Sequence, residues 1–165
     1  MSMETQPAGL SNKGVQDYAR LVGEKYSVWD DEGRADLRGL LDELGGRAIV
    51  QDGPESLHVY EDSTFTIFLP EFTSARRDRF TIAHEIGHYF LHYLYPRRSG
   101  PGSFGRGARN RAETEANVFA SSLLMPEEHF RRIWDALGAD AWKVARHFDV
   151  SPAAASVRAE VLGLG

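Results

Sequence analysis

The apolar residues of this chain recur at two spacings, one typical of helices and one typical of strands. Between residues 75 and 93 they fall three or four positions apart, which places them on one face of a long helix. The same spacing, together with capping and stop residues, predicts four more helices: from Val15 to about Lys25, after Asp30–Asp31 as far as Gly45–Gly46, over Ala112–Leu124, and from Pro126 to near Gly138. Two short helices are expected after Ala139, joined around Phe148–Pro152.

Three short runs have the character of strands: Arg47–Val50, Ser56–Tyr60 and Thr64–Leu69. In the last run Phe65, Ile67 and Leu69 point to one face and Thr64, Thr66 and Phe68 to the other, until Pro70 ends the run. We expect a small, mostly antiparallel three-stranded sheet with Thr64–Leu69 at its edge. The stretch Pro96–Asn110 contains four glycines and two prolines, and this composition predicts a flexible loop.

These elements predict an α+β fold with a mainly helical core, a small sheet and a short helical tail. The chain has 165 residues, a length that suits one domain with a small appendage. We expect a disordered N-terminus over residues 1–13, one domain over 14–138, and a tail of helix-turn-helix character over 139–165 that packs on the core. No apolar run approaches the ~18 residues of a membrane span, and the chain starts without a secretory leader. A cytoplasmic protein without membrane contact is therefore expected.

Charge is distributed unevenly along the chain. The net charge is −5, but residues 1–75 carry 6 Lys/Arg against 14 Asp/Glu, whereas residues 76–165 carry 13 against 10. Five arginines and no acidic residue lie between Arg97 and Arg111. This segment is either a solvated loop or a cover for a cleft that attracts an acidic partner.

Candidate chemistry is restricted by the absence of cysteine, which excludes thiol nucleophiles and every sulfur-based zinc site. The segment His84-Glu85-Ile86-Gly87-His88 fits H-E-x-x-H inside a predicted helix. Residues four apart share a helix face, so both imidazoles can reach one ion while Glu85 stands beside it as a candidate general base. Zinc is the expected metal, although Mn²⁺ or another divalent ion would also fit.

A third ligand is expected from the start of the next long helix, and there are two candidates. Glu113 and Asn117 lie four apart on one face, so one can bind the metal while the other accepts the Nδ1–H of a ligating histidine. Glu113 is favoured on this ground, and Glu115 is the alternative. His92 continues the series 84 and 88, but eight residues of α-helix rotate it about 80° away, so a packed or solvent-facing role is expected.

The remaining candidates concern the substrate. Tyr60 and Thr66, from the strands, and Arg79, from the long helix, are possible substrate-binding residues. A side chain that stabilises the oxyanion is also needed, and Tyr60, Arg79, Tyr89 and Tyr93 are equivalent candidates from the sequence. His58, on a strand, is a weaker candidate for polarising a carbonyl, whereas His129 and His147 are expected to have structural roles.

Two segments together resemble the ImmA/IrrE family of metallopeptidases. The first is Arg79-Phe80-Thr81-Ile82-Ala83-His84-Glu85-Ile86-Gly87-His88-Tyr89-Phe90-Leu91-His92, and the second begins at Glu113-x-Glu115-Ala116-Asn117 and ends at Leu123-Leu124-Met125-Pro126. The resemblance spans roughly Val15 to Val161. It implies a zincin-like, gluzincin-type core, with His84, His88 and Glu113 as metal ligands and Glu85 as catalytic acid/base.

The resemblance also implies a function. The family is bacterial and phage-associated, and its characterised members cleave DNA-binding repressors. A zinc endopeptidase that acts on a separately encoded repressor or antitoxin of the helix-turn-helix type is therefore expected, as in stress-response, mobile-element or toxin–antitoxin systems. Two alternatives stay open: a non-proteolytic metal-binding regulator that sequesters such a partner, and a DNA-binding module. Direct nucleic-acid binding is disfavoured because only Lys143, Arg146 and Arg158 supply cations in the tail.

Overall fold

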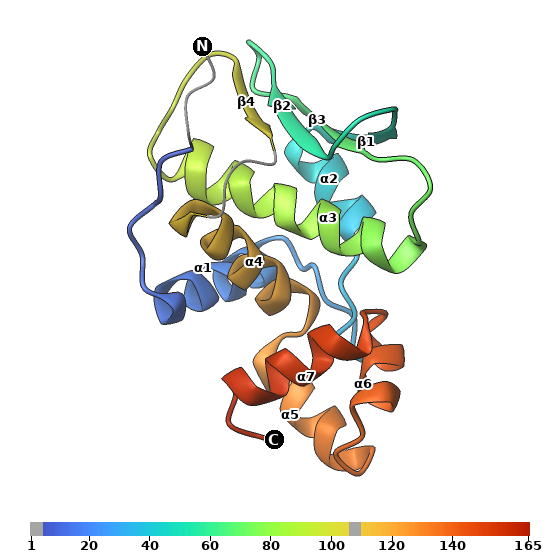
Figure 1. Cartoon of the computed structure of the whole chain (residues 1–165). Helices are drawn as coiled ribbons and strands as arrows, with labels where there is room; N and C mark the ends of the chain where they lie inside the picture. The colour runs from blue at the N-terminus through green and yellow to red at the C-terminus, as the bar shows by residue number, and fades with distance from the viewer. Residues whose placement is uncertain (1–4, 106–109) are drawn as a thin grey trace.

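A small sheet, a long central helix and a pair of helices form successive layers of the molecule (Figure 1). The computed structural model describes residues 5–105 and 110–165. The helical elements are α1 (Asn12–Lys25), α2 (Leu37–Leu44), α3 (Ala75–His88), the π-helix η1 (Tyr89–Leu94), α4 (Arg111–Leu124), α5 (Glu127–Ala136), α6 (Ala141–Phe148) and α7 (Pro152–Val161). The strands are β1 (Gly46–Val50), β2 (Ser56–Val59), β3 (Phe65–Leu69) and β4 (Gly102–Gly105).

The sheet differs from the expected one in size, in direction and in which strand lies at its edge. It has four strands in the order β1-β3-β2-β4. β1 runs parallel to β3, with Gly46 opposite Phe65, whereas β2 is antiparallel to both β3 and β4. The α+β class is confirmed, but the three-stranded antiparallel sheet was wrong. So was the edge position of Thr64–Leu69, because β3 pairs on both sides.

The fourth strand lies inside the segment that its glycines and prolines had marked as a flexible loop. In β4 only Phe104 is buried, at 1% exposure, and its neighbours Gly102 and Gly105 give the strand no alternating pattern. The side chain of Phe104 packs against the rings of Tyr93 and His88, with centroids 6.5 and 6.1 Å away. One buried aromatic ring therefore holds a strand that propensity could not predict. The loop prediction for residues 106–109 lies outside the described residues.

Two helix starts also differ from the prediction. α2 begins at Leu37, where the Asp36 carboxylate accepts a hydrogen bond from Gly39 N. Asp30, the expected cap, instead closes a turn, since its carboxylate accepts from the backbone of Glu32 and Arg34. Ser11 caps α1, which therefore begins at Asn12, earlier than the expected Val15. The expected disorder was therefore wrong for the described residues 8–13, which enter the helix or bond to α4, as shown below; residues 1–4 lie outside the described part.

The core lies between the sheet and α3 on one side and between α3 and α4 on the other. α3 begins at the Ser74 cap, and its buried residues lie almost without interruption between Thr81 and His88, because the helix is covered from both sides. The two short tail helices are present, with Ser151 as cap and Pro152 in the first position of α7. In the described part of the chain, no helix is long and apolar enough to cross a membrane.

Candidate metal centre

The candidate site lies where α3 passes α4 at close range. The two helices can approach because α3 carries a glycine at the crossing: a Cβ atom built on Gly87 would meet the Ala116 carbonyl oxygen at 3.2 Å and the Phe119 side chain at 3.1 Å. The imidazoles of His84 and His88 lie one turn apart on α3, with ring centroids separated by 4.8 Å. Their close approach to α4 brings a carboxylate of that helix within reach of both.

Glu113 is that carboxylate. Its Oε2 lies 3.1 Å from Nε2 of His84, and its Oε1 lies 3.0 Å from Nε2 of His88. Asn110 caps α4 by accepting a hydrogen bond from Glu113 N, which fixes the backbone at this position. The structure thus brings together the three residues expected to bind a metal, and it does so through both oxygens of Glu113.

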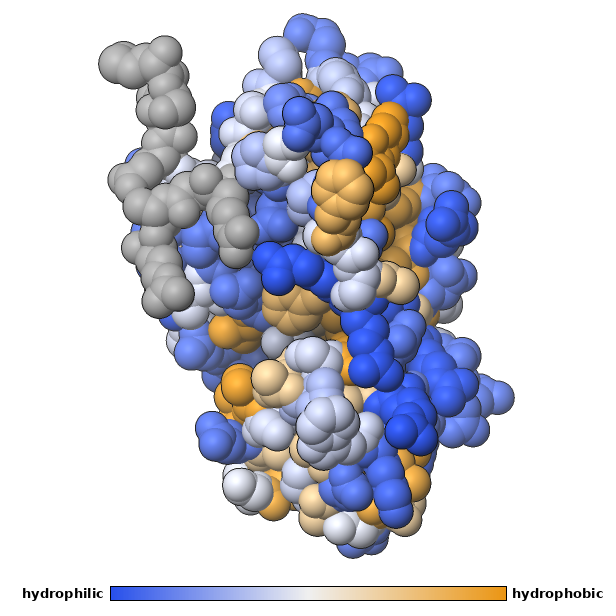
Figure 2. Space-filling model, turned by 45° about the vertical axis from the view of Figure 1, so that its right-hand side comes forward, coloured by the Kyte–Doolittle hydropathy of each residue, from blue (hydrophilic) through white to orange (hydrophobic). Residues whose placement is uncertain are grey.

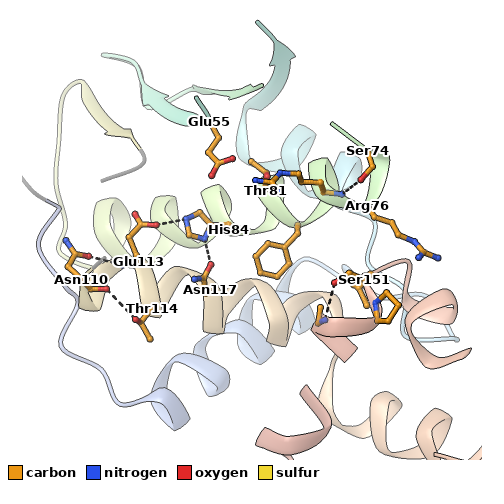
Figure 3. Close-up of a pocket in the computed structure, with 15 residues that line it drawn as sticks. Glu55, Ser74, Arg76, Thr81, His84, Asn110, Glu113, Thr114, Asn117 and Ser151 are labelled. Carbon is orange, nitrogen blue, oxygen red and sulfur yellow. Dashed lines mark hydrogen bonds and ion pairs between the residues drawn. The ribbon is translucent and has the colours of Figure 1, made fainter. Parts of the chain in front are cut away.

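His84 is held in one tautomer by Asn117. Oδ1 of Asn117 lies 2.8 Å from Nδ1 of His84 (Figure 3). The side-chain carbonyl oxygen can only accept, so Nδ1 of His84 carries a proton and Nε2, which faces Glu113, is the nitrogen left to bind a metal ion. This is the arrangement expected of a ligating histidine, whose second nitrogen donates to a fixed acceptor.

Two buried atoms also indicate that these residues fit a metal ion. Within the described part of the chain, Nε2 of His88 and Oε2 of Glu85 are buried without a hydrogen-bond partner. The approach of His88 to Glu113 therefore lacks hydrogen-bond geometry. Two ligands bound tetrahedrally to one zinc ion lie roughly 3.3 Å apart, close to the two observed separations. The ligand atoms of His84, Glu85 and His88 also lie within 4.8 Å of one another.

Burial and the mutual contacts shift the titration of these groups. Burial lowers the pKa of His88 to about 4 and raises the pKa of Glu85 to about 8. Burial also acts on His84 and Glu113, but their contact outweighs it: the pKa of His84 is raised and the pKa of Glu113 is lowered. Two imidazoles and two carboxylates with shifted pKa values, clustered where α3 passes α4, are typical of a functional site.

The role of His92 was missed, and the shape of its helix gives the reason. His92 is 3% exposed, and its Nδ1 lies 2.8 Å from Nδ1 of His88. It belongs to η1, a π-helix, in which hydrogen bonds join i to i+5 and one turn takes more than four residues. A side chain four positions on is then rotated by slightly less than a turn. The expected 80° displacement, which assumes an α-helix, therefore does not apply.

Glu115, the alternative ligand, is also buried but faces away from Glu113. Its Oε1 lies 2.8 Å from Nε2 of His92. Glu115 is thus linked to the metal-ligand candidate His88 through His92. The spacing of four between His88 and His92 was the only signal in the sequence, and the π-helix was not predictable from it.

A cleft of about 820 Å³ opens beside His84. Figure 3 shows that its walls come from α3, α4, the start of α7 and Glu55 in the β1–β2 loop. On the side of the molecule drawn in Figure 2, hydrophobic residues lie in separate patches among hydrophilic ones. The cleft has the same mixed character, since Phe80, Val150 and Ala154 line it together with Arg76 and Arg77. A cleft of this size accommodates a short peptide segment.

The residues expected to bind substrate do not line this cleft. The Tyr60 hydroxyl donates to Oγ1 of Thr66 at 3.0 Å, and Thr66 lies on the face of β3 opposite Phe65 and Ile67. Arg79 donates to the Ala35 carbonyl at 2.9 Å, on another face of α3. None of the three side chains lines the cleft, and their roles in substrate binding stay predictions.

The other candidates for stabilising the oxyanion are also engaged elsewhere. The Tyr93 hydroxyl donates to the Gly100 carbonyl at 2.6 Å, and that of Tyr89 to the Ser63 carbonyl at 3.4 Å. His58 packs edge-on against Phe68 on the sheet. Each of these side chains has a structural contact, and none of them lines the cleft.

Two of the described arginines of the basic segment, Arg98 and Arg111, have local side-chain contacts. The Arg98 guanidinium lies over the Phe104 ring, 5.0 Å from its centroid. Arg111 donates to the Leu10 carbonyl at 2.6 Å. In the tail, Arg158 is 4% exposed and donates to the Met125 carbonyl, so it is not available to a phosphate backbone. Arg106 and Arg109 lie outside the described residues, and whether the segment covers the cleft remains a prediction.

Comparison with known proteins agrees with this geometry. The model of a peptidase family, described as the IrrE N-terminal-like domain of peptidase family M78, matches residues 47–160, well over half of the chain. Among solved structures, a Mycobacterium tuberculosis transcriptional regulator is similar with a TM-score of 0.59 and 15% identity, which shows a shared fold. The match covers 87% of this chain and 45% of that regulator. No curated protein matches the chain.

Proposed function

Since the chain belongs to the peptidase M78 family with an IrrE N-terminal-like domain, we propose that it is a zinc-dependent endopeptidase with protein substrates. The observation that carries the proposal is the convergence of Nε2 of His84 and Nε2 of His88 on the two oxygens of Glu113, at 3.1 and 3.0 Å. Structural zinc sites are closed by four protein ligands, whereas catalytic sites keep a position open. A site with three protein ligands beside a cleft leaves one coordination position open and therefore fits a catalytic zinc site.

In this proposal His84, His88 and Glu113 hold the metal, which supplies Lewis acidity toward a scissile carbonyl and makes a nearby water more acidic. Glu85 is the general base. Its Oε2 is buried without a partner among the described residues, at the edge of the ligand cluster. Burial favours the protonated carboxyl, whereas a bound cation would favour the ionised form, which can accept a proton from the attacking water. The same carboxyl then returns the proton to the leaving amine. Asn117 keeps His84 in the tautomer that this chemistry needs.

The substrate proposed is a separately encoded repressor or antitoxin with a helix-turn-helix domain, the class that the family resemblance implies. The cleft supports an extended peptide as the bound form. Of the two edge strands, β4 is the one that packs on the site, because its Phe104 ring lies against His88 with planes 16° apart. We therefore propose β4, in place of Thr64–Leu69, as the strand that pairs with substrate backbone.

A library of peptides in ¹⁸O-labelled water tests the proposal without knowledge of the natural substrate. The zinc-loaded protein should generate new C-termini that carry ¹⁸O, and Glu85→Gln should generate none while it binds the same amount of zinc. Equal cleavage by both proteins would show that Glu85 is not the base. Full zinc binding without any cleavage by the parent protein, against the library and a co-encoded repressor alike, would favour the non-proteolytic regulator.

A further inference from the structure

A chain of buried contacts leads from His88 away from the cleft. His88 Nδ1 lies 2.8 Å from His92 Nδ1, and His92 Nε2 lies 2.8 Å from Oε1 of Glu115. The side chains of His92 and Glu115 have no exposed surface. Neither residue lines the cleft, so neither contacts a substrate there. Their role must be exerted through His88.

The directions of the hydrogen bonds in this chain follow from its last member. A carboxylate only accepts, so the proton between His92 and Glu115 belongs to Nε2 of His92. A neutral His92 with its proton on Nε2 has a lone pair on Nδ1. The proton between the two histidines therefore belongs to Nδ1 of His88. Nε2 of His88, the atom that approaches Glu113, is then left with its lone pair.

We propose that His92 and Glu115 are positioning residues of the metal centre, which hold His88 in the one tautomer that can bind a metal ion through Nε2. Asn117 has the matching role for His84, so both histidines are oriented. The Asn117 amide at the cleft orients His84, and the buried relay formed by His92 and Glu115 orients His88. The inference rests on the proposed function only for the metal itself. The assignment of protons in the relay does not depend on it.

The N-terminal segment fastens the far end of this relay. The backbone N–H groups of Ala8 and Gly9 donate to Oε1 and Oε2 of Glu115, at 2.8 and 3.1 Å. Arg111, one turn before Glu115 on α4, holds the same segment through the Leu10 carbonyl at 2.6 Å. Ala8 and Gly9, more than one hundred positions before Glu115 in the sequence, thus fix the orientation of the Glu115 carboxylate, which orients His88 through His92. The segment becomes part of the metal centre.

Two nearby features keep the relay intact. The π-helix brings the His92 ring back over His88, as described above. Glu115 accepts three hydrogen bonds, from His92, Ala8 and Gly9, which engage both of its carboxylate oxygens. An ionised, fully buried carboxylate cannot rotate away from His92 without losing these partners.

The proton positions are tested directly by NMR of the protein with ¹⁵N-labelled histidine, both metal-free and zinc-loaded. In both forms His92 should carry its proton on Nε2 only, and a coupling across the hydrogen bond should join Nδ1 of His88 to Nδ1 of His92. A proton on Nδ1 of His92 in either form would overturn the proposal. Since the metal-free measurement involves no zinc, it remains decisive even if the protein proves not to bind zinc.

Zinc affinity, measured by competition with a chromophoric chelator, tests the effect on the metal centre. Gln offers an acceptor and a donor in place of the two ring nitrogens, so His92→Gln should stay within about threefold of the parent, whereas His92→Leu should bind zinc 10- to 100-fold more weakly. The free energy of unfolding without zinc is recorded for both. Equal affinities for the Leu and Gln variants would overturn the proposal, because a purely structural role does not distinguish them in this way.

A proline substitution tests the contribution of the N-terminal segment. Ala8→Pro removes one N–H donor to Glu115 without changing Glu115 itself. We expect a loss of zinc affinity of up to about tenfold, smaller than that of His92→Leu because Gly9 still donates. Thr5→Pro places the same ring before the contact and should leave the affinity unchanged. Parent-like affinity of Ala8→Pro would remove the segment from the metal centre.

Discussion

Gly87→Ala is predicted to destabilise the protein and weaken its metal site, although alanine is the better helix former. The added methyl group would lie 3.1 Å from Cδ1 of Phe119 and 3.2 Å from the Ala116 carbonyl oxygen. Carbon atoms in favourable contact are about 3.5–4.0 Å apart, so one side has to move by a few tenths of an ångström. Neither neighbour can do so easily: Phe119 is fully buried and stacks on Phe90, and the Ala116 oxygen belongs to the backbone of α4.

The expected size of the effect follows from two opposing contributions. Replacing glycine by alanine inside a helix gains about 1 kcal/mol, whereas overpacking a core costs about 1–3 kcal/mol. The net loss of stability should be about 1 kcal/mol. The strain is relieved by moving α3 away from α4, which carries the histidines away from Glu113. Because ligand positions tolerate only about 0.5 Å, zinc affinity should fall severalfold.

Urea denaturation without metal and chelator competition with zinc measure the two effects separately. Gly14→Ala is the matched control: it also adds a methyl group to a helix, but at the exposed first turn of α1, where its nearest contact is the Ser11 hydroxyl at 3.3 Å. This control should be neutral or stabilising by up to about 1 kcal/mol, with unchanged zinc affinity. If Gly87→Ala gains as much stability as the control and binds zinc like the parent protein, the close approach of α3 and α4 does not set the site.

Three further outcomes are expected. Asn117→Leu should weaken zinc binding 10- to 100-fold at almost unchanged metal-free stability, because this exposed residue acts only on Nδ1 of His84. Asn117→Asp keeps the acceptor oxygen and should bind zinc like the parent protein. Chelator competition compares the two variants. Zinc at 100 times its dissociation constant should stabilise the protein by about 2.7 kcal/mol, so a chelator should lower the melting temperature in calorimetry and a null shift would argue against a bound ion. Arg158→Leu should cost about 1–3 kcal/mol in urea denaturation, since the buried Met125 carbonyl loses its donor; a loss under about 0.5 kcal/mol would show that this contact does not hold the tail.

The parts of the fold that could be predicted from the sequence are those in which local pattern and tertiary packing agree. The stripe of α3, its start near Ala75 and the helix that carries Glu113 all follow from residue spacing. The same holds for Ser151 and Pro152 at the start of α7. In each case the local signal and the buried face point to the same element.

The parts that could not be predicted depend on contacts distant in sequence. β4 is a strand because one ring, Phe104, is buried between elements, and β1 pairs in parallel with β3 because of the connection through β2. Nothing in the pattern of residues 89–94 distinguishes a π-helix from an α-helix, so the displacement of about 80° expected for His92 was wrong. The roles of His92 and Glu115 appear only once these positions are known.

The most direct test of the metal centre is a crystal structure of the zinc-loaded protein with anomalous data collected at both sides of the zinc absorption edge. We expect one anomalous peak about 2.0–2.2 Å from Nε2 of His84, Nε2 of His88 and a carboxylate oxygen of Glu113. Glu85 should stay unbound beside the ion, and His92 and Glu115 should keep their contacts behind His88. A peak bound by Glu85 or Glu115 in place of Glu113, or a peak elsewhere in the molecule, would contradict it.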